Sequence, residues 1–541
     1  MASLNTTSHV ATEWSLQAKK PRKDPWGEIS VSAVMTGPDG TQKKLPLYWA
    51  GGDEWKLRVS VSRPGKYILR SECSDPADTG LQGREAILVA EGIRQESNPL
   101  FRHGPIRVKK GKGFVHEDGT PFFWFGDTWW MQMSDRVRWP QDFSTLTGDR
   151  ATKGFSVAQV VLGFPGDLAT DDPRAANEGG LPWEKDLGRI NPGYFDVCDL
   201  RLQTIIRAGI LPCILGSWGY HLLTIGEERM ASHWRYLVAR YGAWPVAWSL
   251  AGETAMSYYL SKDPAGDTEK QRAAWSRVSK AVHSFDPYGR PLSAHPRRTS
   301  WDDLEDPSAL DYLMLQPGHM RNALGIGIDC IADARARFPE KPVVNAEPPY
   351  EGHMGTNGPD VQRFAFWSSI LSGAAGFTYG AAGIFQANDR DRPTGNRPDG
   401  GAFDAATWDE AIRFPGAPQL GRARALLMEL PWDRFEPHPE WASTSVRWGA
   451  ENYDPPLRVY SAGIPSECRV HYIPRRYWHW DGAVIHGIEK GIRYRAEYVD
   501  PERFTRFDLG LVEPDAHGDW KAPTTPYLME WVLVLRRSAE T

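Results

Sequence analysis

The sequence has few of the features that mark secreted scaffolds or membrane proteins. It contains only five cysteines in 541 residues, an odd number without metal-site spacing, which suits a reducing compartment and argues against a disulfide framework. No apolar run approaches the ~20 residues of a membrane span, and the first residues lack the basic and apolar regions of a signal peptide. We therefore expect a cytoplasmic protein with no membrane partner, unless a signal sequence was removed from a longer chain.

Several kinds of chemistry also lack their motifs. The formal net charge of −5 gives no basic footprint, so we expect no nucleic-acid partner. The glycine-rich phosphate loops of nucleotide sites are missing, as are paired Cys or His zinc motifs and the Gly-x-Ser-x-Gly elbow of α/β-hydrolases. We expect no cofactor and no metal, and nothing in the sequence indicates an oligomeric state.

Tryptophan, by contrast, is abundant, with 24 residues. Most are expected to fill the core. A few lie near the ends of predicted strands, where an indole face could stack against the C–H face of a sugar ring.

The order of short patterns along the chain indicates three domains. Residues 1–95 contain short alternating strands separated by Gly and Pro, which are typical of a β-sandwich, and residues 431–541 return to this pattern. Between them, residues 105–430 alternate strand with helix. The predicted fold is an α/β TIM (β/α)8 barrel flanked by N-terminal and C-terminal β-sandwich domains.

The central region contains eight candidate strands, the number that a TIM barrel requires. They span residues 122–130, 155–162, 210–218, 245–253, 290–296, 312–319, 342–347 and 376–386.

Glu253 and Glu347 stand at the ends of the fourth and seventh candidate strands. Carboxyl ends of barrel strands face the reaction chamber, and two carboxylates there are the equipment of a glycoside hydrolase. An apolar strand raises the pKa of a carboxyl at its tip, which suits Glu253 as general acid, while a hydrogen bond from Tyr350 could keep Glu347 ionised as nucleophile. Either glutamate alone could equally be a salt-bridged rim residue; the pair favours catalysis.

Other polar and aromatic residues near the strand ends are candidate sugar contacts. They are Asp127, Trp129, Trp130, Trp218, Tyr220, His221, His295, Gln316, His319, Tyr350, Tyr379 and Gln386. Many hydrogen-bonding groups and few cations fit a neutral, polyhydroxylated ligand. The most polar stretch, residues 388–401, lacks the acidic spacing of an EF-hand and is expected to be a solvated active-site loop.

Three segments carry a family resemblance: residues 119–130 with 150–157, the run Lys341–Gly352 (KPVVNAEPPYEG), and residues 366–380. They resemble the apiosidase-like glycoside hydrolases. The resemblance covers nearly the whole chain and implies a (β/α)8 barrel of the broad retaining clan, with Glu253 as acid and Glu347 as nucleophile. Larger clan members usually carry Asn before the acid, whereas Gly252 stands here.

We therefore expect a retaining O-glycoside hydrolase of the apiosidase-like type that acts in an exo manner on plant- or microbe-derived oligosaccharides or glycosides, with furanosides among the candidate substrates. Two alternatives remain open from the sequence. A carbohydrate-binding barrel that has lost catalysis would explain the missing Asn, and a carbohydrate lyase would use Tyr220 or Tyr379 as base.

Overall fold

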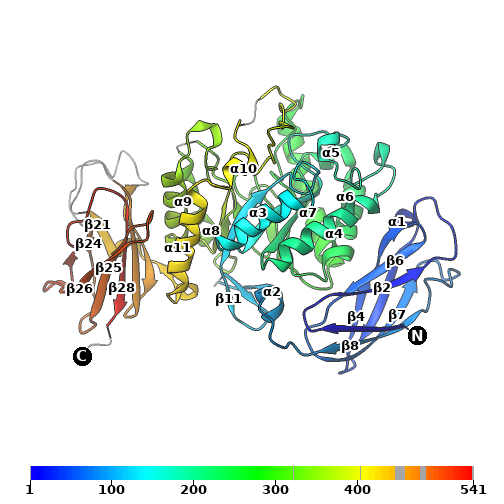
Figure 1. Cartoon of the computed structure of the whole chain (residues 1–541), viewed down its shortest axis with the longest axis horizontal. Helices are drawn as coiled ribbons and strands as arrows, with labels where there is room; N and C mark the ends of the chain where they lie inside the picture. Colours follow the sequence, from blue (N-terminus) through cyan, green and yellow to red (C-terminus); the bar gives the residue numbers. More distant parts are fainter. Residues whose placement is uncertain are drawn as a thin grey trace.

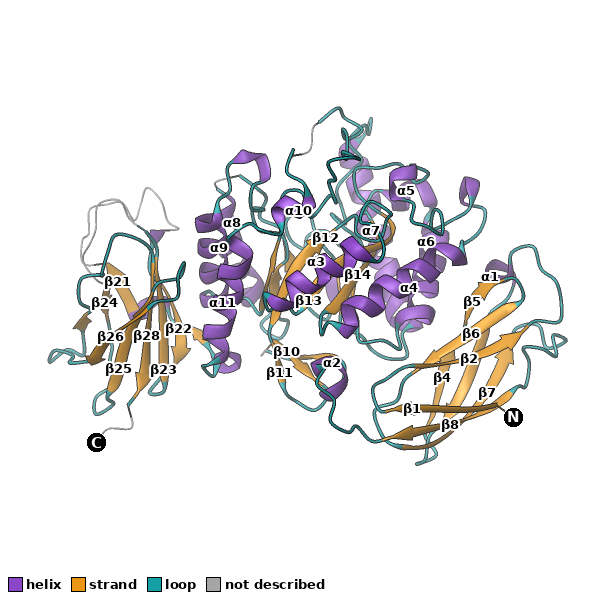
Figure 2. Ribbon diagram, viewed as in Figure 1, coloured by secondary structure: helices purple, strands orange, loops and turns teal. Residues whose placement is uncertain are grey.

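The computed structural model describes residues 2–111, 113–320, 322–401, 404–444, 457–475 and 483–538. Three modules lie in a row, with a helix-covered barrel between two β-rich ends (Figure 1). Figure 2 shows that nearly all the helices belong to the central module.

The N-terminal module consists of two facing sheets. One has the order β1 (Ala2–Thr7), β8 (Glu85–Glu91), β7 (Gly65–Cys73), β3 (Val31–Thr36) and β4 (Gln42–Pro46). The other comprises β2 (Thr12–Gln17), β6 (Glu54–Val59) and β5 (Tyr48–Gly51), and the short helix α1 (Pro25–Glu28) lies beside it. In β7 buried and solvent-facing residues alternate strictly, as expected for a sheet with one face in the core. Only the β1–β8 pair is parallel among the described pairs of this module.

A short connector leads into the barrel. Helix α2 (Pro99–Arg102) is capped by the Asn98 side chain, which accepts from the backbone N–H of Leu100. Strands β9 (Ile106–Lys109), β10 (Gly113–His116) and β11 (Pro121–Phe122) then form a small antiparallel sheet below the barrel (Figure 2).

The barrel sheet contains eight parallel strands. In chain order they are β12 (Trp124–Trp129), β13 (Val157–Phe164), β14 (Leu211–Ser217), β15 (Ala247–Ser249), β16 (Leu292–Ser293), β17 (Leu313–Leu315), β18 (Val343–Asn345) and β19 (Gly376–Tyr379). Strands β12 to β16 pair in chain order, as do β17 to β19, and β12 pairs with β19. No ladder joins the described residues of β16 and β17. All residues of these strands are buried, as expected for strands enclosed by side chains inside and helices outside. The predicted eight-strand barrel is confirmed.

Helices cover the outside of the barrel (Figure 1). They are α3 (Gln141–Thr152), α4 (Pro192–Arg207), α5 (His221–Ile225), α6 (Glu227–Tyr241), α7 (Pro264–Phe285), α8 (Ala323–Arg337), α9 (Pro359–Leu371), α10 (Trp408–Ala411) and α11 (Gly416–Met428). Proline occupies the first turn of α4, α7 and α9, where its missing N–H costs no hydrogen bond. No helix among the described residues is long and apolar enough to cross a membrane.

The C-terminal module also has two sheets. The larger has the order β20 (Glu436–Pro437), β22 (Tyr460–Ile464), β23 (Cys468–Ile473), β28 (Trp531–Arg537), β25 (Tyr494–Val499) and β26 (Arg506–Leu511). The smaller comprises β21 (Ala442–Thr444), β24 (Ala483–Ile485) and β27 (Trp520–Lys521). The predicted domain limits at 95, 105 and 431 fall in segments between the described elements.

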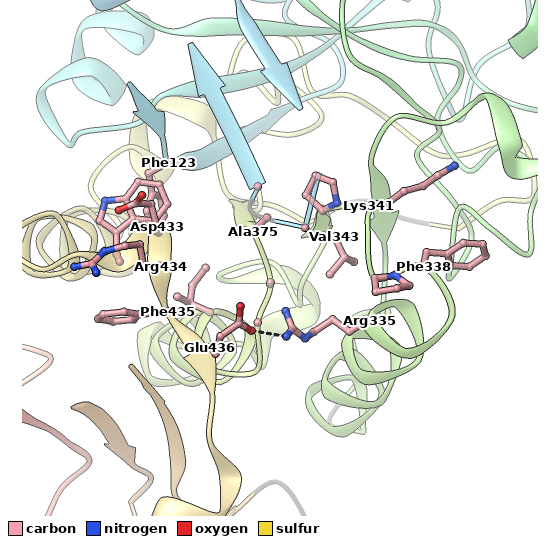
Figure 3. Close-up of a pocket in the computed structure, with 18 residues that line it drawn as sticks. Phe123, Arg335, Phe338, Lys341, Val343, Ala375, Asp433, Arg434, Phe435 and Glu436 are labelled. Atoms are coloured by element: carbon pink, nitrogen blue, oxygen red, sulfur yellow. Dashed lines mark hydrogen bonds and ion pairs between the residues drawn. The ribbon is translucent and has the colours of Figure 1, made fainter. Parts of the chain in front are cut away.

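Buried contacts join both end modules to the barrel. Arg58 of β6 forms an ion pair of 2.6 Å with Asp199 of α4. On the other side, Arg363 of α9 forms an ion pair of 2.5 Å with Glu530. A cleft at the foot of the barrel adjoins the C-terminal module, where the ion pair between Arg335 of α8 and Glu436 of β20 spans the junction (Figure 3).

Candidate active site

A cavity at the carboxyl ends of the barrel strands contains the two predicted catalytic glutamates. Glu253 follows β15, the fourth strand, and Glu347 follows β18, the seventh. Both side chains line a cavity of about 180 Å³. The curvature of the nearly closed barrel thus brings together two residues that are far apart in the sequence.

Neutral hydrogen-bond donors hold Glu253. The indole Nε1 of Trp218 donates to Oε2 over 3.0 Å, and Nε2 of Gln316 donates to Oε1 over 3.0 Å. Burial, and then the negative charge of Glu347, raise the pKa of Glu253 to about 7. The Glu253 backbone has φ 44°, in the left-handed region, where a residue other than Gly is strained. Its surroundings keep Glu253 substantially protonated near neutral pH.

Two histidines hold Glu347, whose side chain is almost fully buried. Nε2 of His319 lies 3.0 Å from Oε1, and Nε2 of His295 lies 3.2 Å from Oε2. The backbone N–H of Tyr350 points to Nδ1 of His319, which leaves the Nε2 proton of that ring to donate to Glu347. Burial by itself raises the pKa of Glu347, but the two nearby imidazoles of His295 and His319 outweigh it and hold that pKa below its usual range.

The largest lowering effects on the pKa of Glu347 come from the two histidines, which the prediction for Tyr350 did not include. Tyr350 lines the cavity, and burial followed by the charge of Glu347 raises the pKa of its hydroxyl well above the ordinary value. The two histidines supply the stabilisation because an imidazole can donate a proton and also carry positive charge.

Gly252 has a steric explanation. A Cβ atom at this position would lie 2.3 Å from the indole ring of Trp218. The ring also lies against Gly166, where a Cβ would approach it to 2.8 Å. Trp218 therefore fits between two glycine backbones, and its Nε1 reaches Glu253 only because position 252 has no side chain.

Aromatic side chains form a separate hydrophobic cluster around the cavity. Trp130 packs edge-to-face against Trp218, with ring centroids 5.3 Å apart, and against His295 at 5.1 Å. The buried members of this cluster are Trp130, Val161, Leu215, Trp218, Tyr220, Tyr350 and Phe385.

Two amide side chains bring unpaired polar atoms to the same cavity. Oε1 of Gln316 and Nε2 of Gln386 are buried and have no hydrogen-bond partner among the described residues. Buried polar atoms are normally paired, so an unpaired acceptor and an unpaired donor in one cavity indicate a ligand with hydroxyl groups.

Six of the predicted ligand contacts line the cavity: Trp130, Trp218, Gln316, His319, Tyr350 and Gln386. His295 does not line it but lies 3.2 Å from Glu347. Asp127 and Trp129 do not line it. Asp127 forms a buried ion pair of 2.6 Å with Arg150 of α3 and accepts from the Trp129 indole over 2.8 Å. Both side chains join the first strand to α3, because a buried carboxylate requires a cationic partner.

Tyr220, His221 and Tyr379 also lie outside the cavity lining. The Tyr220 hydroxyl accepts from the backbone N–H of Asp167 over 2.8 Å. His221 contacts the carbonyl of Pro165 at 2.9 Å, and burial lowers its pKa to about 4. Tyr379 donates to Glu351 over 2.6 Å. Each of these polar groups makes a hydrogen bond within the protein.

Several lining residues were not predicted. Asp167 and Tyr259, from the loops after β13 and β15, are hydrogen-bonded to each other, and burial raises the pKa of Asp167. His353 and Phe385 also line the cavity. No local pattern distinguishes these loop residues, whose positions depend on contacts between loops.

Arginines at the cavity correct the expectation of few cations. Arg174 and Arg397 pair with Asp172 and Asp399, respectively. Arg136 has no carboxylate within ion-pair distance among the described residues and donates to the carbonyls of Ala387 and Arg392.

Thr394 and Arg397 come from the polar loop 388–401, so that loop does border the cavity. The polar composition of this loop was the sequence feature that indicated its place beside the cavity. The charge of the lining therefore gives no argument against an acidic substrate.

Comparisons with known proteins agree with this architecture. The sequence model of the apiosidase-like catalytic domain matches residues 108–434, more than half of the chain. A search of curated proteins finds no match.

Three solved structures share the fold. A glycoside hydrolase superposes with a TM-score of 0.66 at 19% identity, covering 83% of this chain and 100% of that chain. A candidate glycoside hydrolase from Bacteroides vulgatus has a TM-score of 0.71 at 16% identity, covering 99% of this chain and 100% of that chain. A glycoside hydrolase family 5 protein from the same organism has a TM-score of 0.64 at 20% identity, covering 83% and 96%.

Proposed function

Because the chain belongs to the apiosidase-like family of glycoside hydrolases, we propose that it hydrolyses O-glycosides with retention of anomeric configuration. The observation that supports the proposal most is that the pKa values of two neighbouring carboxyls are shifted in opposite directions. Glu253 has a pKa of about 7, while the pKa of Glu347 lies below its usual range. One proton donor and one ionised carboxylate are what a double displacement requires.

In the first step, an oxygen of Glu347 attacks the anomeric carbon of the bound sugar. The bond from that carbon to the leaving oxygen breaks, and the proton of Glu253 passes to the leaving oxygen. The products are a free alcohol and a glycosyl ester on Glu347. The histidines fix the Glu347 oxygens, which reduces the motion needed to reach the anomeric carbon.

In the second step, water attacks the same carbon and its proton passes to Glu253. The ester bond breaks and Glu347 becomes ionised again. Esterification removes the negative charge that raises the pKa of Glu253, so this residue becomes more acidic in the intermediate and ionises, ready to act as base.

The cavity also supports exo action. Its volume of about 180 Å³ is below the ~300–1,000 Å³ of pockets for drug-sized ligands, and so fits a single sugar ring better than a chain. The unpaired amide atoms of Gln316 and Gln386 suit sugar hydroxyls, and Trp130 and Trp218 supply apolar faces.

Release of nitrophenol from a panel of nitrophenyl furanosides and pyranosides tests the activity and identifies the sugar. NMR of the first product from an active substrate tests retention, because the initial anomer must match that of the substrate. An inverted first product would contradict the double displacement. Release of only monosaccharide from the matching oligosaccharides would support exo action.

A binding barrel without catalysis is the alternative. It predicts that the sugar panel shows binding but no turnover, and that Glu347→Gln changes neither. The charge separation between the two glutamates favours the enzyme, since binding a sugar requires no protonated acid beside an ionised carboxylate.

A further inference from the structure

A second cleft lies at the opposite end of the barrel from the catalytic glutamates. It has a volume of about 510 Å³ and is formed by the N-terminal module together with segments that precede β15 and β16. The N-terminal module contributes Lys43 of β4 and Arg63, β9 contributes Arg107, and the segment before β16 contributes Tyr288 and Arg290.

Arg290 is a buried cation without an acidic partner. Its side chain is only 4% exposed, and its Nε donates to the carbonyl of Gly242 over 2.9 Å. Its Nη1 has no hydrogen-bond partner, and no carboxylate lies within ion-pair distance among the described residues. The guanidinium lies 5.3 Å from the centre of the Tyr288 ring, which offsets only part of its lost hydration.

Two of the other cations that line the cleft, Lys43 and Arg107, lie near Arg290. Nζ of Lys43 lies 4.7 Å from the centre of the Tyr288 ring. Arg107 donates to the carbonyl of Gly289 over 3.4 Å. Neither side chain has an ion pair among the described residues. Burial, and then the positive charge of Arg290, lower the pKa of Lys43, and burial, followed by the charge of Arg107, lowers the pKa of Arg290 to about 10.

The carboxylates in and beside the cleft are engaged by groups other than these three cations. Asp286 accepts from the backbone N–H groups of Tyr288 and Arg290 and from the indole of Trp248. Glu117 accepts from Ser62 and faces His9, and Asp39 accepts from the backbone of Thr41. The three cations therefore repel one another in a partly desolvated space that no carboxylate neutralises at contact distance.

We propose that this cleft binds an anionic group, a phosphate or the carboxylate of an acidic saccharide, through Lys43, Arg107 and Arg290. Such a group gives the buried guanidinium a charged acceptor and relieves the repulsion among the cations. Because Lys43 and Arg290 come from different modules, the ligand would also tie the N-terminal module to the barrel. The site is separate from the proposed hydrolysis and does not depend on it.

Calorimetric titration of the full chain with inorganic phosphate, with glucuronate and with glucose tests the proposal. We expect phosphate, glucuronate or both to bind and to raise the Tm, and glucose not to bind at this cleft. Lys43→Ala and Arg107→Ala should each weaken anion binding about tenfold, since a hydrogen bond to a charged group is worth roughly 1.5–3 kcal/mol. Lys43 and Arg107 are half-buried, so these variants should fold, whereas Arg290→Gln alters a buried side chain.

Lys44→Ala is the matched control, because Lys44 is the next residue of β4, is exposed and pairs with Glu72 instead. It should bind the anion as the unaltered chain does. Binding of phosphate alone or of glucuronate alone supports the site and identifies the source of the anion. Failure of both anions to bind at millimolar concentration, or equal binding by Lys43→Ala and Lys44→Ala, would overturn the proposal. Anions bound at the arginines of the active-site cavity would give that equal binding.

Discussion

A glutamate follows each of β15 and β18, and the surroundings of the two shift their pKa values in opposite directions. Glu253 receives hydrogen bonds from an indole and an amide, and its pKa rises to about 7. Glu347 is more deeply buried, but two imidazoles lie near its oxygens and lower its pKa. Burial acts in the same direction on both carboxyls, so the chemical type of the neighbour decides whose pKa is raised and whose is lowered.

Replacing the ionised member of the pair should have the largest effect. Glu347→Gln removes the nucleophile, and we expect kcat to fall by about three orders of magnitude or more on the best nitrophenyl glycoside. Glu340→Gln is the control, since Glu340 is exposed just before β18 and should retain full activity. A loss of less than tenfold in Glu347→Gln would contradict the assignment.

Replacing the protonated member should have a smaller effect that depends on the leaving group. Glu253→Gln should lower kcat/KM by about 10²–10⁴-fold on a glycoside with a poorly acidic alcohol. The loss should be much smaller on a dinitrophenyl glycoside, whose leaving group needs no proton. Steady-state rates on the two substrates provide the measurement, and equal losses would contradict the role of acid.

The pH profile reports both environments at once. Glu253 acts in its protonated form, so kcat/KM should fall as pH rises through about 7. Glu347 acts in its ionised form, and its lowered pKa places the acid limb below the usual range for Glu. A bell-shaped pH profile of kcat/KM with its alkaline limb near pH 4 to 5 would mean that Glu253 is not held in its protonated form.

Removing one imidazole should bring the pKa values of the two glutamates closer together. His319→Gln keeps a side-chain donor but loses the ring that can carry charge, so the pKa of Glu347 should rise by about one unit or more. The acid limb should then move to higher pH, with about tenfold lower kcat/KM at its acid end. The alkaline limb serves as the internal reference, because Gln316 and Trp218 still hold Glu253. An unchanged acid limb would remove His319 from this role.

The smallest effect is expected from a substitution that tests how the Trp218 ring packs against Gly252. Gly252→Ala places a Cβ 2.3 Å from the indole ring, so the ring must shift and its bond to Glu253 must weaken. We expect about tenfold lower kcat/KM and an alkaline limb moved to higher pH, because that bond lowers the pKa of Glu253. Gly148→Ala in α3 is the control, since a Cβ there meets nothing within 4 Å. Equal activity of the two variants would contradict the steric account.

Candidate site residues divide according to what each prediction depended on. The meeting of Glu253 and Glu347 in one cavity could be predicted because it needs only a strand count and the rule that strand ends face the chamber. Asp127 satisfied the same rule but does not line the cavity, since it pairs with Arg150 of α3 and nothing local in the sequence indicates that pair. Asp167 and Tyr259 were missed because their hydrogen bond depends on the paths of two loops, which the sequence does not indicate.

The sequence by itself determined the eight-strand repeat, the two flanking β-rich regions and the presence of a carboxylate at the end of the fourth and seventh strands. These follow from periodicity and chain order, which are local properties. Only the tertiary structure decided which carboxyl is protonated, why position 252 is Gly and which cations lack partners at either end of the barrel. Those properties depend on distances of about 3 Å between residues far apart in the chain, and hydrogen bonds and charges act at that range.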